Sequence, residues 1–198
     1  MARLLINSYH ALTLVDDYRD YFGWLYTPRI VPTDYNKSLI DHLPYAADND
    51  AFNGLNEDKY NTLLQLLNNM NPMWITAPDS VGDYKETNRL FAVWFDKICR
   101  FPVAYVLQDG ITTQDIPWDC IECVFLGGTT DFKLSDHARN LLIYAKNKGK
   151  LVHVGRVNSI KRIKMFWNIC DSFDGSGFSR YSKAMLPRYM RFLDEEII

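Results

Sequence analysis

The sequence lacks the long apolar runs and the glycine patterns that mark several large classes of protein. No window reaches the roughly 18 consecutive apolar residues of a membrane span, and the first residues become polar too soon for a signal peptide. We therefore predict no membrane partner and a cytosolic location. Neither a G-x-G-x-x-G segment nor a P-loop occurs, which argues against a dinucleotide or nucleoside triphosphate site. The sequence predicts no cofactor.

Cysteine is also scarce, with four in 198 residues. In a cytosolic protein these are expected to be reduced thiols. Cys120 and Cys123 have C-x-x-C spacing, but Cys99 and Cys170 stand alone, and no second cysteine pair or histidine pair completes a zinc set. Because a buried cysteine commonly serves as a small hydrophobe, we predict no metal site.

Acidic residues are nearly absent from residues 146–191. This segment holds eleven of the 22 lysines and arginines against two acids, a local charge of +9, whereas residues 1–145 carry −8. The asymmetry indicates either a polyanion bound against this part of the chain or a solvated helix face that balances an acidic face elsewhere. On the first interpretation, the nucleic-acid-binding residues are Arg156, Lys161, Arg162 and Lys164.

Hydrophobic residues make up 47% of the chain, which suits one globular domain spanning residues 1–198. Apolar runs of strand length alternate mostly with helical patterns, which predicts a parallel α/β fold. Seven short runs favour a (β/α) TIM-type barrel over an open doubly wound sheet, so the eighth strand is missing, irregular or hidden in residues 9–43. The seven predicted strands are residues 3–8, 44–47, 73–77, 102–107, 123–126, 151–154 and 171–173.

Helical spacing of apolar residues separates most of these strands. Asn56 and Ser135 are placed to cap two of the helices, and a short helix is expected near residues 16–23. The longer predicted helices cover residues 56–69, 84–98, 135–148 and 160–169.

Polar or glycine residues follow every predicted strand from the second onward. In α/β sheets and barrels, catalytic groups project from the loops at the carboxyl ends of the strands. Asp174 lies just past the last strand, although Asp-Gly is also a common turn dipeptide, which is the alternative interpretation of Asp174-Gly175 alone. The strand-end positions are Asp48, Asp79, Gln108, Gly127-Gly128, Gly155 and Asp174.

Several of these positions lie in longer segments that occur in a fixed order. They include Asp48-Asn49-Asp50-Ala51-Phe52-Asn53, Val106-Leu107-Gln108-Asp109-Gly110, Gly127 to Leu134, and Asp171 to Asp174 with Arg180 six residues on. Taken in order, they resemble the tRNA-guanine transglycosylase superfamily. The similarity is greatest to its short phage members, which exchange guanine in DNA for a 7-deazaguanine.

The resemblance implies a base-exchange enzyme of the pentosyltransferase type that works through a covalent aspartyl-glycosyl intermediate. Exchange of a base with retention needs two displacements, and therefore one nucleophilic carboxylate and one that handles protons. Asp174 is the expected nucleophile and Asp48 the general acid/base. Both should face one pocket at the barrel mouth. The substrate-binding residues that the resemblance implies are Asp79, Gln108, Gly127, Gly128, Gly155 and, for a phosphate, Arg180.

The chain departs from the tRNA enzymes in three ways. Asp50 and Asp109 replace glycines, and no cysteine or histidine follows Cys170, so a carboxyl-terminal zinc module is absent. The last difference favours DNA over tRNA as the partner, with a 7-deazaguanine base as the small-molecule substrate. Base exchange on tRNA, hydrolysis of the N-glycosidic bond, and a non-catalytic nucleic-acid-binding relic of the fold are the alternatives.

Overall fold

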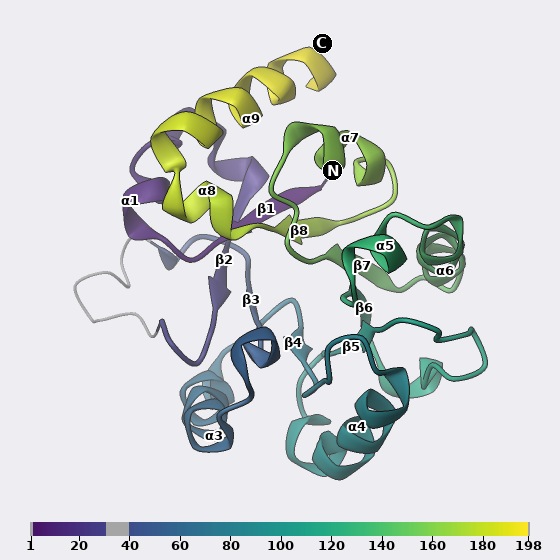
Figure 1. Cartoon of the computed structure of the whole chain (residues 1–198). Coiled ribbons are helices and arrows are strands. Elements are labelled where there is room, and N and C mark those ends of the chain that lie inside the picture. Colours follow the sequence, from purple (N-terminus) through teal and green to yellow (C-terminus); the bar gives the residue numbers. More distant parts are fainter. Residues whose placement is uncertain (1, 31–39, 198) are drawn as a thin grey trace.

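The chain folds into a closed barrel of eight parallel strands surrounded by helices (Figure 1). The computed structural model describes residues 2–30 and 40–197. Strands follow each other around the barrel in chain order, from β1 to β8. This arrangement confirms the predicted TIM-type α/β barrel.

The strands are short, and most of their residues are buried, as expected when a parallel sheet is covered on both faces. All seven predicted strands are present within a few residues of the expected positions. The eight strands are β1 (Arg3–Ile6), β2 (Phe22–Tyr26), β3 (Tyr45–Ala47), β4 (Ile75–Thr76), β5 (Val103–Leu107), β6 (Cys123–Leu126), β7 (Leu151–Val154) and β8 (Ser172–Asp174).

The strand that the sequence left open is β2, which lies between β1 and β3. It follows a six-residue 3-10 helix, η1 (Asp16–Tyr21), where a short helix running to Gly23 was expected. Gly23 lies within β2, and glycine weakens the strand pattern because it has no side chain to pack. The eighth strand is thus hidden in residues 9–43, of which residues 31–39 lie outside the described part.

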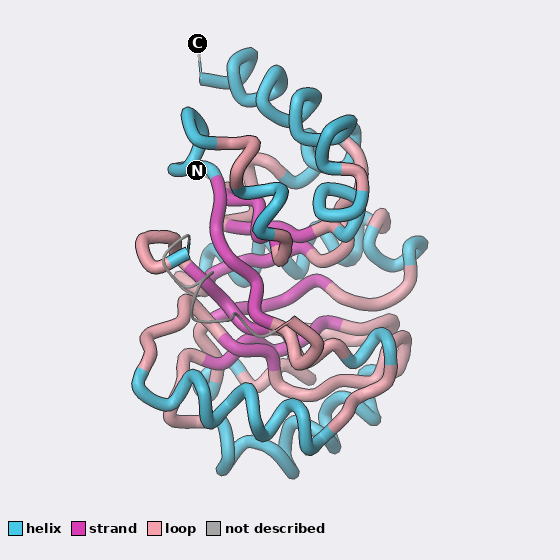
Figure 2. Tube along the Cα trace, turned by 90° about the vertical axis from the view of Figure 1, so that its left-hand side faces the viewer, coloured by secondary structure: helices cyan, strands magenta, loops and turns pink. Residues whose placement is uncertain are grey.

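Helices cover the outside of the strands and appear above and below them in the side view (Figure 2). Asn56 and Ser135 cap α3 and α6 as predicted, each accepting a hydrogen bond from a backbone N–H of the first turn. The α-helices are α1 (Tyr9–Leu12), α3 (Glu57–Leu66), α4 (Tyr84–Ile98), α5 (Thr130–Lys133), α6 (Asp136–Asn147), α7 (Ile160–Phe166), α8 (Ser176–Arg180) and α9 (Ser182–Ile197). Further 3-10 helices are η2 (Ala51–Asn53), η3 (Leu67–Asn69) and η4 (Trp118–Cys120).

The hydrophobic core has two parts, one between strands and helices and one inside the barrel. Trp74 and Phe125 occupy the interior, with their ring centroids 5.8 Å apart. Side chains fill the interior of the barrel, as is usual for this fold. No helix of the described residues is long and apolar enough to cross a bilayer.

Pairing of the last strand with the first closes the barrel. The register places Leu5 of β1 opposite Asp174 of β8. Before β8, the Asp171 carboxylate accepts a hydrogen bond from the Val152 N–H at 2.8 Å and forms an ion pair with Lys146. These contacts fix the start of β8 against β7 and α6.

Gly23 provides a test of the packing around β2. A Cβ atom added there would lie 2.6 Å from both Leu5 Cδ2 and the Pro44 carbonyl oxygen. We expect Gly23→Ala to lower the free energy of unfolding by about 1–3 kcal/mol, because both the Leu5 side chain and the backbone at Pro44 must move. Urea denaturation measures this change. The exposed Val93→Ala is the control and should alter stability by no more than about 0.5 kcal/mol.

Candidate active site

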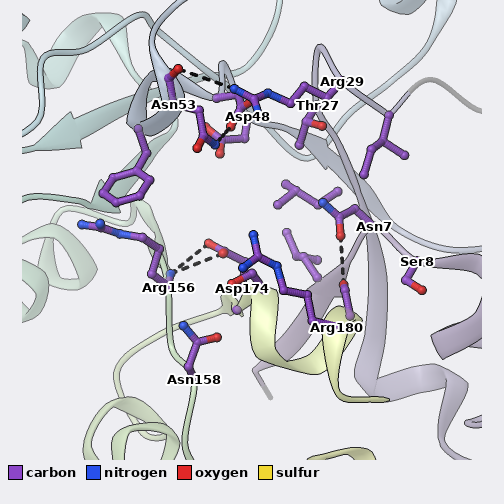
Figure 3. A pocket seen from close by; sticks show the side chains of 18 of the residues that line it. Asn7, Ser8, Thr27, Arg29, Asp48, Asn53, Arg156, Asn158, Asp174 and Arg180 are labelled. Atoms are coloured by element: carbon purple, nitrogen blue, oxygen red, sulfur yellow. Dashed lines mark hydrogen bonds and ion pairs between the residues drawn. The ribbon is translucent and has the colours of Figure 1, made fainter. Parts of the chain in front are cut away.

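A pocket of about 730 Å³ opens at the carboxyl ends of the strands, and both predicted catalytic carboxylates line it. We call it the mouth pocket; its lining includes Asn7, Asp48, Lys133, Arg156, Asp174 and Arg180. Figure 3 shows Asp48 on one side of the opening and Asp174 with Arg180 on the facing side. The barrel thus brings together Asp174 of β8 and Asp48 of the loop after β3, although the two residues lie far apart in the sequence.

A second, smaller pocket of about 60 Å³ adjoins the first, and we call it the inner slot. It shares Asp48, Phe52, Arg156 and Asp174 with the mouth pocket. Its other walls include the predicted residues Asp79, Gln108, Gly127 and Gly128, together with Val81 and Phe125. Most of the predicted site residues therefore surround one continuous region.

Asp174 is the last residue of β8, and 16% of its side chain is exposed. Its Oδ2 atom lies 3.0 Å from His153 Nε2, and both carboxylate oxygens lie 3.3 Å from the backbone nitrogen of Arg156. Two N–H donors from β7 and the following loop thus fix the orientation of this carboxylate toward the pocket.

His153 is a site residue that the sequence analysis missed. It is fully buried on β7, where its ring lies 4.6 Å from Trp74 and 4.5 Å from Phe125 between centroids. Burial lowers its pKa, although the hydrogen bond to Asp174 opposes the shift. A neutral ring that donates from Nε2 to Asp174 accepts at Nδ1 from the Ser172 hydroxyl, 2.8 Å away. The only sequence signal was a histidine within an apolar strand.

Asp48 follows β3 and lies in a partly buried, crowded position. Burial raises the pKa of its carboxyl group to about 7, and the negative charges of Asp174 and Asp79 add to the effect. The Thr76 hydroxyl lies 3.3 Å from Asp48 Oδ1. Near neutral pH this group can both give and take a proton, which is the property of a general acid/base.

Asp79 and Gln108 form one wall of the inner slot and are hydrogen-bonded to each other. Gln108 Nε2 donates to Asp79 Oδ2 at 2.7 Å, and the Gly82 N–H donates to Gln108 Oε1 at 2.8 Å. Asn49, which the sequence analysis did not single out, donates to Asp79 Oδ1 at 2.8 Å. Burial raises the pKa of Asp79 to about 6, while the Asn49 hydrogen bond opposes this shift. The wall presents acceptors and donors in fixed positions.

The predicted glycines differ in their positions. Gly127 and Gly128 line the inner slot, and Gly128 has a φ of +74°, which disfavours a side chain. Gly155 lines neither pocket. A Cβ atom on Gly155 would lie 2.5 Å from the Phe125 ring and 3.4 Å from Asp174 Oδ2, so this glycine allows β7 to pack closely behind the site.

The predicted basic residues divide into two groups. Arg162 and the exposed Arg180 line the mouth pocket, whereas Lys161 and Lys164 on α7 do not. Lys164 instead approaches Glu195 of α9, with 3.6 Å between Nζ and Oε2.

Arg156 points into the site rather than outward. Its guanidinium donates to the Gly128 carbonyl at 2.6 Å and lies 4.2 Å from the centroid of Phe52. Phe52 itself is 62% exposed, an unusual position for a phenylalanine, and it borders both pockets. The sequence analysis placed Phe52 only inside a longer segment.

Asp50 and Asp109 are accommodated differently. Asp50 has a positive φ of 60°, a conformation that aspartate tolerates better than most residues, and its carboxylate lies 2.5 Å from Arg29. Asp109 accepts hydrogen bonds from the backbone N–H and the hydroxyl of Thr129, at 2.8 and 2.5 Å. Both aspartates therefore support the loops of the site.

The cysteines lie away from these pockets. Cys123 is buried inside the barrel and Cys120 is exposed. Within residues 2–30 and 40–197, no group of three or more histidine, cysteine or acidic side chains is arranged to hold a metal ion.

Comparisons with known proteins show similarity in fold. No family model matches the chain, and no curated protein matches it. The structure is similar to tryptophan synthase from M. tuberculosis in its ligand-free form, with a TM-score of 0.54 and 14% identity over 94% of this chain and 88% of that one. It is also similar to KGPDC from Streptococcus mutans, with a TM-score of 0.54 and 14% identity over 90% and 89% of the two chains.

Other similar structures are longer than this chain. A mandelate racemase/muconate lactonizing protein from Herpetosiphon aurantiacus has a TM-score of 0.52 and 12% identity, and the match covers 89% of this chain and 54% of that one. The chain spans 42% of the length of L-talarate dehydratase from Polaromonas sp. JS666. At these identities the likeness shows the barrel fold.

The raised pKa of Asp48 predicts how stability depends on pH. Because the folded-state pKa is about 7 and an unfolded aspartate titrates near 3.9, this group stabilises the fold below pH 4, and its contribution is lost as the pH rises toward 7. We expect Asp48→Asn to be more stable than the wild type at pH 8, by about 1–3 kcal/mol, and similar to it at pH 4. Urea unfolding at the two pH values measures the difference; exposed Asp119→Asn should show none.

Proposed function

We propose that this protein is a nucleic-acid base-exchange enzyme that replaces guanine in DNA with a 7-deazaguanine. One observation carries the proposal: two carboxylates in different environments, Asp174 and Asp48, line one pocket. Asp174 accepts hydrogen bonds that orient it for attack, whereas Asp48 has a pKa near neutrality. Enzymes that carry out displacement at a sugar carbon commonly use two such carboxylates, one as the nucleophile and the other as the general acid/base.

The proposed reaction has two displacements at C1′ of the target nucleotide. Asp174 attacks C1′ as guanine departs, and Asp48 protonates the leaving base. The result is an ester between the sugar and Asp174. Asp48, now a carboxylate, removes a proton from the incoming 7-deazaguanine, whose nitrogen attacks C1′ and releases Asp174. Both displacements invert the sugar carbon, so the product retains the original configuration.

The inner slot is the proposed site for the flat base. Its wall of Asp79 and Gln108 offers a carboxylate that can accept from the ring N–H and the amino group of a guanine-like edge. Phe52, exposed at the rim, can stack on the base. Since a base paired within a duplex cannot reach such a slot, the target guanine must be flipped out or unpaired.

Replacing the nucleophile tests the reaction. We expect Asp174→Asn to abolish incorporation of a 7-deazaguanine into DNA while the protein remains folded, because the change removes the nucleophile and keeps the shape of the side chain. Mass spectrometry of nucleosides from treated DNA and tRNA measures incorporation, and circular dichroism checks the fold. Exposed Asp119→Asn is the matched control.

The outcomes separate the alternatives. Incorporation at the wild-type rate by Asp174→Asn would contradict the mechanism. Incorporation into tRNA alone would favour the tRNA reaction, release of guanine without incorporation would favour hydrolysis, and binding without either reaction would favour a non-catalytic role.

Residues 146–191 carry a local charge of +9, which predicts DNA binding that weakens steeply with added salt. The reason is that lysines and arginines release counterions from the DNA phosphates when they bind. Arg162 lines the mouth pocket, whereas Lys164 already approaches Glu195. We therefore expect Arg162→Glu to weaken binding more than Lys164→Glu, and both to act equally on different DNA sequences. Fluorescence anisotropy at several salt concentrations measures both effects. The control is Lys97→Glu, near the carboxyl end of α4 and away from the barrel mouth. Affinity independent of salt would contradict the prediction.

A further inference from the structure

The mouth pocket contains a buried amine that the proposed base exchange does not use. Lys133 ends helix α5, after β6, and only 7% of the residue is exposed. It nevertheless lines the mouth pocket together with Asp48 and Asp174. Its Nζ atom donates a hydrogen bond to the Gly155 carbonyl at 2.6 Å. A lysine seldom occupies so buried a position without a specific partner or task.

The surroundings of Lys133 favour the neutral amine. Burial is the main cause that lowers its pKa to about 7, and the nearby guanidiniums of Arg156 and Arg162 lower it further. The carboxylates of Asp174 and Asp48 act in the opposite direction. At neutral pH a large share of Lys133 is thus unprotonated, whereas an exposed lysine, with a pKa near 10.4, is almost wholly charged.

Burial and a neighbouring cation are the two features that activate lysines as nucleophiles. Proteins prepare a lysine for attack on a carbonyl group by removing water from it or by placing another cation beside it. Lys133 has both, and it lies in the pocket where the proposed reaction exposes C1′ of a sugar. A lysine that only supported the Gly155 carbonyl would need a donor and a charge, which arginine also supplies.

We propose that Lys133 forms an imine with C1′ of an abasic deoxyribose in DNA held in the mouth pocket. The identity of the sugar rests on the proposed function; the reactivity of the amine does not. In the open form of an abasic sugar, C1′ is an aldehyde carbon. The Nζ electron pair adds to C1′ to give a carbinolamine. The hydroxyl group then leaves as water, with a proton that Asp48 can supply, and the C=N bond forms.

Such an imine would capture a by-product of base exchange. If water instead of a base releases the sugar from Asp174, an abasic site remains in the pocket. Its aldehyde carbon is the same C1′ atom that the carboxylate attacked, so it lies within the group of residues that includes Lys133. The inference therefore adds a second covalent activity, toward damaged or incompletely processed DNA, to the same site.

Borohydride trapping tests the proposal directly. The full-length protein is mixed with an oligonucleotide that carries one abasic site, and sodium borohydride is added to reduce the imine to a stable secondary amine. We expect a covalent protein–DNA adduct that peptide mass spectrometry locates at Lys133. The adduct should already form near pH 7, where both neutral Lys133 and protonated Asp48 are present, rather than only above pH 9 as for exposed lysines.

Matched variants separate chemistry from structure. Lys133→Arg supplies an N–H donor for Gly155 but, being permanently charged, cannot form an imine, so it should lose the adduct. Exposed Lys97→Arg, near the carboxyl end of α4, should keep it.

Two results would overturn the inference: no adduct with the wild type between pH 6 and 9, or an adduct located at another residue. The position of the adduct is measured on the wild-type protein, so this result does not depend on whether any variant folds. Base exchange without trapping would remove this inference alone, and trapping without base exchange would remove the proposed function alone.

Discussion

Burial of four titratable side chains beside the barrel mouth is the condition on which the site depends. Asp48, Asp79, Lys133 and His153 all have pKa values moved toward their neutral forms, and burial is the largest cause for each. In water the two aspartates and the lysine would be almost fully charged at neutral pH, and the histidine would be about one quarter charged. The barrel gathers them at one end, and their shared desolvation allows protons to move among them under mild conditions.

The carboxylates of the site differ in their hydrogen-bond partners. Asp79 and Gln108 satisfy each other along one wall, whereas Asp174 receives donors from behind through His153 and Arg156. The side of Asp174 that faces the mouth pocket is thus available to a ligand. A rigid arrangement behind a reacting group limits the reorganisation needed during the reaction. Asp50 and Asp109 brace the neighbouring loops through their contacts with Arg29 and Thr129.

The barrel and the carboxylates at its mouth could be predicted because they leave periodic signals. Apolar residues predominate in most of the seven predicted strands, and polar or glycine residues follow the strands from the second onward. β2 gave no such signal, because Gly23 and a preceding 3-10 helix disturb the pattern. His153 and Lys133 were not foreseen, since their importance arises from contacts with loops distant in sequence. A histidine in an apolar strand and a lysine in a four-residue helix do not indicate a site from the sequence alone, because the folded barrel supplies their partners.

The pairing of β8 with β1 also has a consequence for how the protein acquires its site during synthesis. Asp174 belongs to the last strand to leave the ribosome, and it finds its register beside Leu5, near the amino terminus. Contacts between segments so distant in sequence form late, because closing a long loop is entropically costly. A nascent chain can therefore assemble much of its sheet while the carboxylate pair is still incomplete. The site is completed only in the step that turns an open sheet into a barrel.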